Sequence, residues 1–322
     1  MEHTDRRVLV GPGIGRDAAA VAFGGRALVA ASDPVTFAAE QVGWYAVHVN
    51  ANDVACLGAR PRWFLATVLL PDPSDASLAA AVLDQIRDAC RDLGVELIGG
   101  HTEVAPGLDR PVVAGTMLGE TARERLVTAA GAAVGDAVLL TKGLALEGTA
   151  ILAREARDAL LARGVPPAVV DAAARLLFSP GISVVPEAAT AAAGGAVHAM
   201  HDPTEGGLAT ALHELAEAAG VGVALDREAV PVLPETEAVC AALGLDPLGL
   251  LASGALLLTV PQEEAGRLTE RLAAAGVRTT QIGRIIPAAE GTIMRTPAGP
   301  VPLPRFPRDE LARWFDEAAV SG

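Results

Sequence analysis

Aromatic residues and lysine are scarce in this sequence. Phe, Trp and Tyr together make up 3% of the 322 residues, and Lys142 is the only lysine. No basic run interleaved with aromatic residues is present, and 39 acidic against 25 basic residues give a net charge of −14. Such a surface repels a phosphate backbone, so we expect no nucleic-acid partner. Because 51% of the residues are hydrophobic, the chain can bury a large core, which aliphatic side chains must fill.

Long apolar runs and cysteine pairs are missing as well. The longest uncharged stretch, residues 247–262, is broken by Pro and Gly and is shorter than the roughly 20 residues of a spanning helix. The charged N-terminus does not resemble a secretory signal, so we expect a cytoplasmic protein with no membrane segment. Cys56, Cys90 and Cys240 form no C-x-x-C pair, which favours buried thiols over a zinc or redox site.

Apolar runs alternate with helical patterns along the whole chain, which predicts an α/β (α+β) architecture in two domains. The strands predicted for the first domain are 18–21, 27–31, 63–70, 95–98 and 112–118, and its helices are 43–57 and 75–93. The second domain is predicted to begin with a strand at 137–141, followed by helices at 145–163, 166–177, 184–193 and 205–220. We therefore expect domains at 1–125 and 126–322.

The common nucleotide and hydrolase signatures are not present. Arg16 stands where the last glycine of a G-x-G-x-x-G fingerprint belongs, and Lys142 is followed by Gly143 alone rather than forming G-K-[ST]. The chain contains neither H-E-x-x-H nor G-x-S-x-G. A dinucleotide fold, a P-loop, a zinc protease and an α/β-hydrolase are thereby excluded.

Glycine-flanked polar clusters stand out in the otherwise aliphatic chain. Asp17 follows a Gly-Ile-Gly-Arg turn, and Asp33 ends a predicted strand, where a solvent-facing turn would explain it equally well. Asn50 and Asp53 are three residues apart on a predicted helix and so share one edge of it. Because Asn and Asp are mediocre helix formers, this pair indicates a ligand or metal role, with a solvated helix face as the alternative.

A fourth cluster, Ile-Gly-Gly-His-Thr-Glu-Val, is predicted to end a buried strand, and it contains Gly100, His101 and Thr102. His101 could act as an acid or a base, although a histidine at a strand end is as often structural.

The fifth cluster, His-Asp-Pro-Thr-Glu-Gly-Gly-Leu, joins a predicted strand to a helix. Thr204 is the predicted N-cap, and Gly206 and Gly207 would leave the first-turn N–H groups open to an anion. Alternatively, Asp202 and Thr204 simply cap the helix. Carboxylates and glycine-rich anion sites together suit Mg²⁺ and phosphate, so the sequence predicts a Mg²⁺-nucleotide held without a P-loop. The candidate metal ligands are Asp17, Asp33, Asp53 and Asp202.

In their order and spacing these clusters resemble the AIR synthase (PurM)-like superfamily, in particular its HypE and AIR-synthase-related members. The resemblance runs from about residue 11 to 295 and is carried by GIGRDAAAV, SDP, HVNANDVACLGARP, IGGHTEV, HDPTEGGLATALHELAEAAGV and LGLDPLGLLASGALLLTV. It implies a two-domain fold whose N-terminal sheet pairs across a homodimer, with ATP in the cleft that the dimer forms. The cofactor-binding positions that it implies are Asp17, Asp33, Asn50, Asp53, Gly100, Thr102, Asp202, Thr204, Gly206 and Gly207.

The resemblance implies an ATP- and Mg²⁺-dependent enzyme that activates or phosphorylates an oxygen of a small substrate, with Asp53 and His101 as catalytic residues. Two departures bear on the substrate. HypE proteins end in Pro-Arg-Ile-Cys, whereas this chain continues past Phe306 with no cysteine after Cys240, and Glu205 replaces an arginine of the HypE pattern. The alternatives are a non-catalytic nucleotide-binding partner in hydrogenase or metalloenzyme maturation and a thiamine-monophosphate-kinase-like enzyme. Lys142 is a further candidate phosphate ligand.

Overall fold

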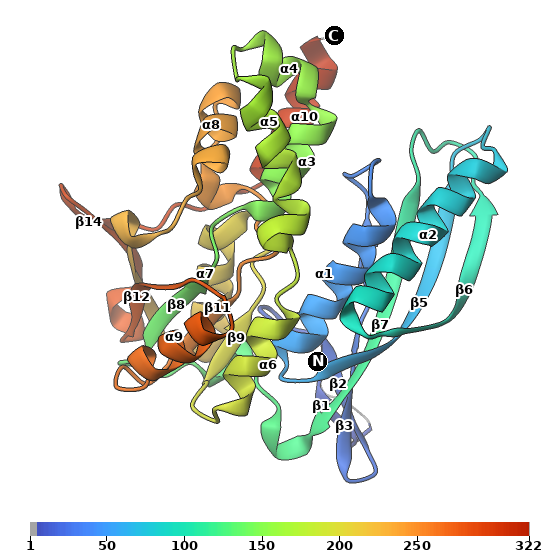
Figure 1. Cartoon of the computed structure of the whole chain (residues 1–322). Coiled ribbons are helices and arrows are strands. Elements are labelled where there is room, and N and C mark those ends of the chain that lie inside the picture. The colour runs from blue at the N-terminus through green and yellow to red at the C-terminus, as the bar shows by residue number, and fades with distance from the viewer. Residues whose placement is uncertain (1–4, 322) are drawn as a thin grey trace. The chain divides into compact units, whose positions relative to one another are not determined.

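The computed structural model describes residues 5–321, which form two compact units (Figure 1). Among these residues, the first unit comprises 5–12 and Asp17–Leu126, and the second comprises Gly13–Arg16 and 127–321. Both units mix helices with a β-sheet, as the alternating sequence pattern predicts. The boundary between the units falls within the first polar cluster. Its glycine turn, Gly13–Arg16, belongs to the second unit, whereas Asp17 belongs to the first.

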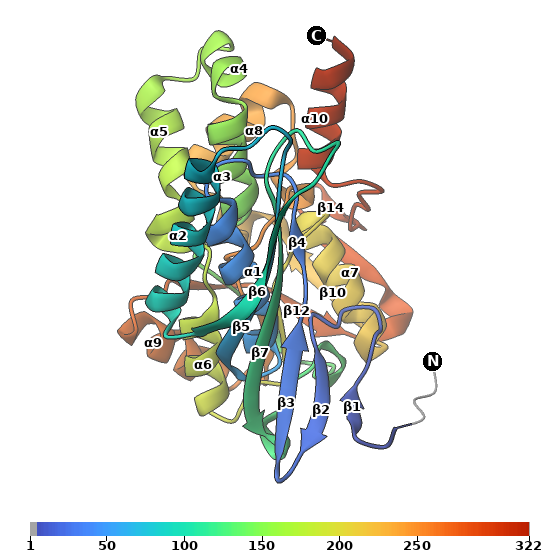
Figure 2. The ribbon, with the colours of Figure 1, turned by 90° about the vertical axis from the view of Figure 1, so that its right-hand side faces the viewer.

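The first unit is a seven-stranded sheet covered on one face by two helices (Figures 1 and 2). Its strand order is β1-β2-β3-β7-β5-β6, with β4 added to β7, and only β5 and β6 are parallel. The strands are β1 (Val8–Val10), β2 (Ala19–Phe23), β3 (Arg26–Ala31), β4 (Pro34–Val35), β5 (Arg60–Leu70), β6 (Glu96–Val104) and β7 (Val112–Ala122). The helices are α1 (Val42–Cys56) and α2 (Ala76–Leu93).

Local sequence signals explain α2. Asp75 caps it by accepting the N–H of Leu78, and Gly94 ends it in the left-handed conformation. Val82 and Ile86 lie on its buried face, as the apolar spacing predicts. Helix α1 is different, because nearly all of it is buried, its polar residues included.

The fourth polar cluster does not end a buried strand, so that prediction was wrong. Strand β6 continues through Val104, lies at the edge of the sheet, and is exposed along nearly its whole length. It pairs with β5 on one side only. A long exposed edge of this kind presents backbone N–H and C=O groups to a further strand.

The second unit is also built on seven strands, in the order β14-β13-β10-β12-β8-β11-β9. The strands are β8 (Ala137–Thr141), β9 (Ala199–His201), β10 (Gly222–Asp226), β11 (Leu257–Val260), β12 (Thr279–Ile286), β13 (Thr292–Thr296) and β14 (Gly299–Pro302). The helices are α3 (Leu146–Glu155), α4 (Arg157–Ala162), α5 (Pro167–Arg175), α6 (Val185–Ala193), α7 (Gly207–Ala219), α8 (Pro234–Leu243), α9 (Ala265–Ala274) and α10 (Glu310–Ser321).

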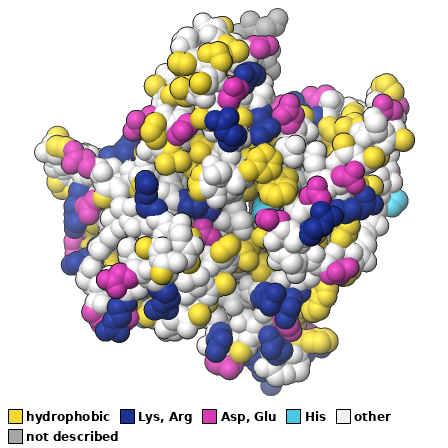
Figure 3. Space-filling view, in the orientation of Figure 1, with side chains coloured by type: hydrophobic (Ala, Val, Ile, Leu, Met, Phe, Trp, Pro, Cys, Tyr) yellow, Lys and Arg dark blue, Asp and Glu magenta, His cyan; other side chains and the backbone are white. Residues whose placement is uncertain are grey.

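The core of the second unit is aliphatic, as the scarcity of aromatic residues predicts. Strands β8 and β11 are buried at every position, and their side chains are mostly aliphatic, including Leu139 and Leu140 of β8. At the surface, acidic and basic side chains are interspersed on the face shown in Figure 3.

The segment Pro167–Ala193 is apolar and long enough to cross a membrane by length and composition alone. It is not a continuous helix, because Ser179 interrupts it with φ −148° and ψ 111°. The flanking helices α5 and α6 have nine residues each. Each is therefore about 13 Å long, whereas a hydrocarbon core is about 30 Å thick. The interruption separates two ordinary short helices.

The three cysteines are free and buried, as predicted. Burial raises the pKa of the Cys90 and Cys240 thiols to about 12. These thiols therefore remain protonated and act as small apolar side chains.

Candidate functional site

Asn50 holds the loop that carries Asp33. Its Oδ1 accepts the backbone N–H of Asp33 at 2.9 Å, and its Nδ2 donates to the backbone oxygens of Asp33 at 3.1 Å and Ala46 at 2.9 Å. Asn50 is completely buried in α1, whereas Asp33 is half-buried at the end of β3. The sequence predicted both residues for the site, and the structure shows that Asn50 positions the backbone of Asp33.

Gly115 in β7 makes this clamp possible. Its N–H donates to the backbone oxygen of Asp33 at 3.0 Å. A Cβ at this position would lie 2.5 Å from Nδ2 of Asn50 and 2.7 Å from the Phe64 ring. Only glycine lets the sheet come so close to α1 here, so three elements fix one acidic loop.

The register of the first hairpin brings Asp17 towards Asp33. Ala19 of β2 pairs with Ala30 of β3, so the two acids leave the hairpin at the same end. Asp53 follows Asn50 on α1 and is 5% exposed. Within residues 5–321 no group of three or more His, Cys, Asp or Glu side chains is close enough to hold a metal by itself. A metal role for Asp17, Asp33, Asp53 and Asp202 therefore stays a prediction.

A hollow of about 350 Å³ lies beside the edge strand of the first unit. The polar cluster contributes Gly100, His101 and Thr102 to its lining, together with apolar residues that include Leu83 of α2. At Gly100 the backbone of β6 packs directly against β5, because a Cβ there would overlap the backbone oxygen of Ala66. The cluster predicted from sequence thus borders a real cavity.

His101 is exposed in this cluster, and its Nε2 lies 3.3 Å from Oε2 of Glu103. Both side chains are more than half exposed. Such a pair gives the imidazole a carboxylate partner that orients it.

Helix α7 in the second unit begins without a side-chain cap of its own. Its N-cap is Gly206, so the prediction that Thr204 caps the helix was wrong. Gly206 and Gly207 both adopt positive φ, at 75° and 62°. A Cβ on Gly207 would lie 2.5 Å from the backbone oxygen of Leu248, so the two glycines serve close packing as well as the turn.

The backbone N–H of Gly206, at the start of α7, already has a hydrogen-bond partner. Oδ2 of Asp309 accepts the N–H of Gly206 at 2.7 Å. Asp202, which is completely buried, accepts the N–H of Gly254 at 3.3 Å. The predicted anion site therefore already holds a carboxylate from the chain itself, a contact that spans 103 residues and leaves no local sequence signal.

Two further acids lie near this carboxylate. Glu147 stands in the first turn of α3 and is 4% exposed. Burial, helped by the charges of Glu205 and Asp309, raises its pKa to about 7, against the effect of a hydrogen bond with Ser253. Glu205 itself is exposed. Sequence reasoning missed Glu147, because only the fold buries it.

Lys142 is a structural residue, which corrects its candidacy as a phosphate ligand. Its Nζ lies 2.8 Å from Oε1 of Glu187 and donates to the backbone oxygens of Gly181 at 3.0 Å and Ser183 at 2.6 Å. Both side chains are buried, and the three partners use the three donors of the ammonium.

Comparison with known proteins places both units in one family. The profile of the AIR synthase related protein N-terminal domain matches residues 15–121, and that of the C-terminal domain matches residues 133–295. The chain belongs to the AIR synthase related family. Carbamoyl dehydratase HypE of Cupriavidus necator is 32% identical over 286 residues, covering 84% of this chain and 77% of the relative. A putative hydrogenase expression/formation protein of Methanocaldococcus jannaschii is 27% identical and covers 88% and 83%.

Solved structures confirm the predicted AIR synthase-like fold. Escherichia coli HypE matches with a TM-score of 0.77 at 24% identity, covering 89% of this chain and 88% of that one. HypE in complex with ATP matches with a TM-score of 0.71 at 26% identity, covering 92% and 89%. Both family profiles end before residue 296, so the segment that carries Asp309 lies outside them.

Proposed function

We propose that this AIR synthase related protein binds ATP with Mg²⁺ and uses it to activate or phosphorylate an oxygen of a small substrate. The observation that carries the proposal is the Asn50 clamp on Asp33, which fixes an acidic loop at the end of β3 through two hydrogen bonds to the Asp33 backbone. Its relatives support it: several are named carbamoyl dehydratase HypE, and one HypE structure holds ATP.

The donor set of the first unit fits a hard cation. Asp17, Asp33 and Asp53 offer carboxylate oxygens, the ligands that Mg²⁺ prefers, and two of them leave the same end of one hairpin. When bound, Mg²⁺ would neutralise charge on the phosphates. Asp53 and His101 remain the proposed catalytic residues, with His101 as the group that could move a proton. Gly100 and Thr102 would border the ligand in the hollow beside β6.

A second copy of the chain is part of this proposal. The exposed edge of β6 and the half-buried outward face of β7 are surfaces that a second sheet could cover. A homodimer would then complete a cleft beside His101 and Thr102. The domain limits 1–125 and 126–322 and a cytoplasmic location also stay predictions.

A second candidate function is nucleotide binding without turnover, as a partner in hydrogenase or metalloenzyme maturation. One observation favours it: the start of α7 is filled by Asp309 rather than open to phosphate. A solved HypE–HypF complex shows that a protein of this fold assembles with another protein. This candidate predicts ATP affinity with no ADP release for any acceptor.

Calorimetry and a coupled ADP assay distinguish these functions. Wild-type protein is titrated with ATP in the presence of Mg²⁺, and ADP release is followed with thiamine monophosphate and other small acceptors. Asp53→Ala should abolish turnover, whereas Asp84→Ala, an exposed acid of α2 that pairs with Arg87, should leave it unchanged. Substrate-dependent ADP release would exclude the non-catalytic candidate, and absence of ATP binding would exclude both.

A further inference from the structure

The chain beyond β14 is attached along α7. Nε2 of His213 lies 3.3 Å from the backbone oxygens of both Leu303 and Pro304. The Phe306 ring then packs so closely on Gly249 that a Cβ there would overlap it. The segment therefore runs from the middle of α7 towards the start of that helix, and it is held by an apolar contact on the way.

At the start of α7 the segment inserts a carboxylate. Oδ2 of Asp309 accepts the N–H of Gly206, and Oδ1 accepts the N–H of Leu311, both at 2.7 Å. Asp309 is 7% exposed. One carboxylate thus caps two helices, and for α7 it stands where the helix dipole and the open N–H groups favour an anion.

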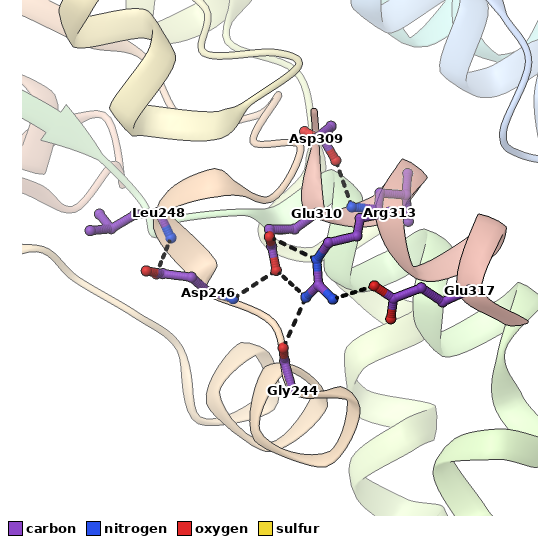
Figure 4. Close-up of polar contacts among 8 residues, drawn as sticks. Gly244, Asp246, Leu248, Asp309, Glu310, Arg313 and Glu317 are labelled. Atoms are coloured by element: carbon purple, nitrogen blue, oxygen red, sulfur yellow. Dashed lines mark hydrogen bonds and ion pairs between the residues drawn. The ribbon is translucent and has the colours of Figure 1, made fainter. Parts of the chain in front are cut away.

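A second anchor holds the same segment to the loop after α8 (Figure 4). Oε2 of Glu310 accepts the N–H of Asp246 at 3.1 Å and lies 2.6 Å from Nη2 of Arg313. Arg313 also donates to the backbone oxygen of Gly244 at 3.0 Å and pairs with Glu317 at 2.9 Å. This anchor touches neither Gly206 nor Gly207, so the two attachments can be changed separately.

The inserted carboxylate is not in a favourable environment. Burial raises the pKa of Asp309 to about 6, against the effect of its backbone hydrogen bonds, and the nearby charge of Glu205 adds to the rise. The protein environment therefore stabilises the charged form of Asp309 less than water does. The segment also lies outside the residues that the two family profiles match.

We propose that the C-terminal segment from Leu303 through α10 is a latch. Its Asp309 carboxylate occupies the anion-binding start of α7 and has to withdraw before a phosphate group of a nucleotide or substrate can bind there. This inference rests on the proposed function for the nature of the ligand, but the latch itself is defined by contacts within the second unit. The phosphate group and the latch then compete for the N–H of Gly206. A variant that loosens the latch therefore has a higher apparent affinity for the phosphate-bearing ligand.

The test uses Trp314, which lies on α10 and reports whether the segment is attached. In full-length protein with Trp44→Phe and Trp63→Phe, Trp314 is the only tryptophan left. We compare this protein with the same protein carrying Asp309→Asn, Arg313→Ala or Asp316→Asn, by calorimetry with Mg²⁺-ATP and by fluorescence. Asp316 pairs with Arg308 and is half exposed, so its variant changes charge in the segment without touching α7.

Asp309→Asn should bind Mg²⁺-ATP about tenfold more tightly, the gain expected if the latch is closed nine-tenths of the time. Arg313→Ala should shift affinity in the same direction, and Asp316→Asn should not shift it. Saturating ATP should change Trp314 emission in the parent protein. Equal affinities in all four proteins together with unchanged Trp314 emission would overturn the latch.

Failure of the proposed function gives a different pattern. If none of the proteins binds ATP, that function is wrong, and the latch is judged by Trp314 anisotropy and by proteolysis of the segment. Greater mobility and faster cleavage in Asp309→Asn than in Asp316→Asn would then uphold the latch. Identical values in these two variants would overturn it.

Discussion

Glu147 is a carboxylic acid that the fold buries without a basic partner among the described residues. It is 4% exposed, and burial raises its pKa from 4.5 to about 7. At pH 8 it is ionised in an environment that disfavours the charge. Glu147→Gln keeps the shape of the side chain and removes that charge, so we expect the variant to be more stable than wild type at pH 8.

The size of the effect follows from the shift in pKa. A change from 4.5 to about 7 is roughly 2.5 pKa units, which corresponds to about 3 kcal/mol at 1.36 kcal/mol per unit. Because the folded pKa is the higher one, the folded state binds the proton more tightly. The stabilising contribution of Glu147 is complete below pH 4.5 and is lost as pH rises through about 7. The advantage of glutamine should therefore be near zero at pH 4.5 and about 3 kcal/mol at pH 8.

Urea denaturation at pH 5 and pH 8 measures this difference. Glu187→Gln is the matched control, since Glu187 is equally buried but pairs with Lys142 at 2.8 Å. It should lower stability by about 3–5 kcal/mol, because it leaves a buried ammonium without its carboxylate. A Glu147→Gln variant that is less stable than wild type at pH 8, or whose advantage does not change with pH, would refute the argument.

Three further substitutions test the packing around the site. Asn50→Ala removes three hydrogen bonds, so it should lower the free energy of unfolding by about 2–3 kcal/mol and weaken Mg²⁺-ATP binding in calorimetry. Gly100→Ala should cost about 2 kcal/mol or more in urea denaturation, whereas Gly99→Ala, which shares the strain of a positive φ but whose Cβ would meet only Leu65 at 3.9 Å, should cost less; equal losses would contradict the backbone overlap. Lys142→Met should destabilise as much as Glu187→Gln in the same assay, and a neutral result would show that the pair is not closed in solution.

Local signals in the sequence predicted the elements that depend on neighbouring residues. Helix α2 lies within one residue of its predicted bounds, because Asp75 and Gly94 provide its caps and its apolar spacing has the helical period. The two-domain fold also followed from the sequence, through the order of the polar clusters. The match of both family profiles confirms it.

The failures share one cause, which is that contacts between distant residues decided the outcome. Thr204 has the chemistry of an N-cap, but Asp309 caps α7 from a position 103 residues away. Lys142 seemed available for phosphate until the fold placed Glu187 beside it. The bounds of β6 were misjudged because the glycines that appear to end a strand instead let it lie against Ala66 of β5.

The Asn50 and Asp33 pair shows both what the sequence could predict and what it could not. Each residue was predicted for the site from its type and surroundings. Their contact across 17 residues, and the need for Gly115 between them, appeared only in the fold.

Calorimetric titration of wild type and Asp33→Asn with ATP in the presence of Mg²⁺ addresses the proposed function without requiring a known substrate. The substitution preserves size and leaves the backbone groups held by Asn50 in place, so it removes one charge and little else. We expect saturable binding by wild type and at least a tenfold loss of ATP affinity in the variant. A tenfold loss corresponds to about 1.4 kcal/mol, on the order of the free energy of one charge-assisted contact to the metal. Equal affinities, or no binding by wild type, would contradict a Mg²⁺-ATP site at this loop.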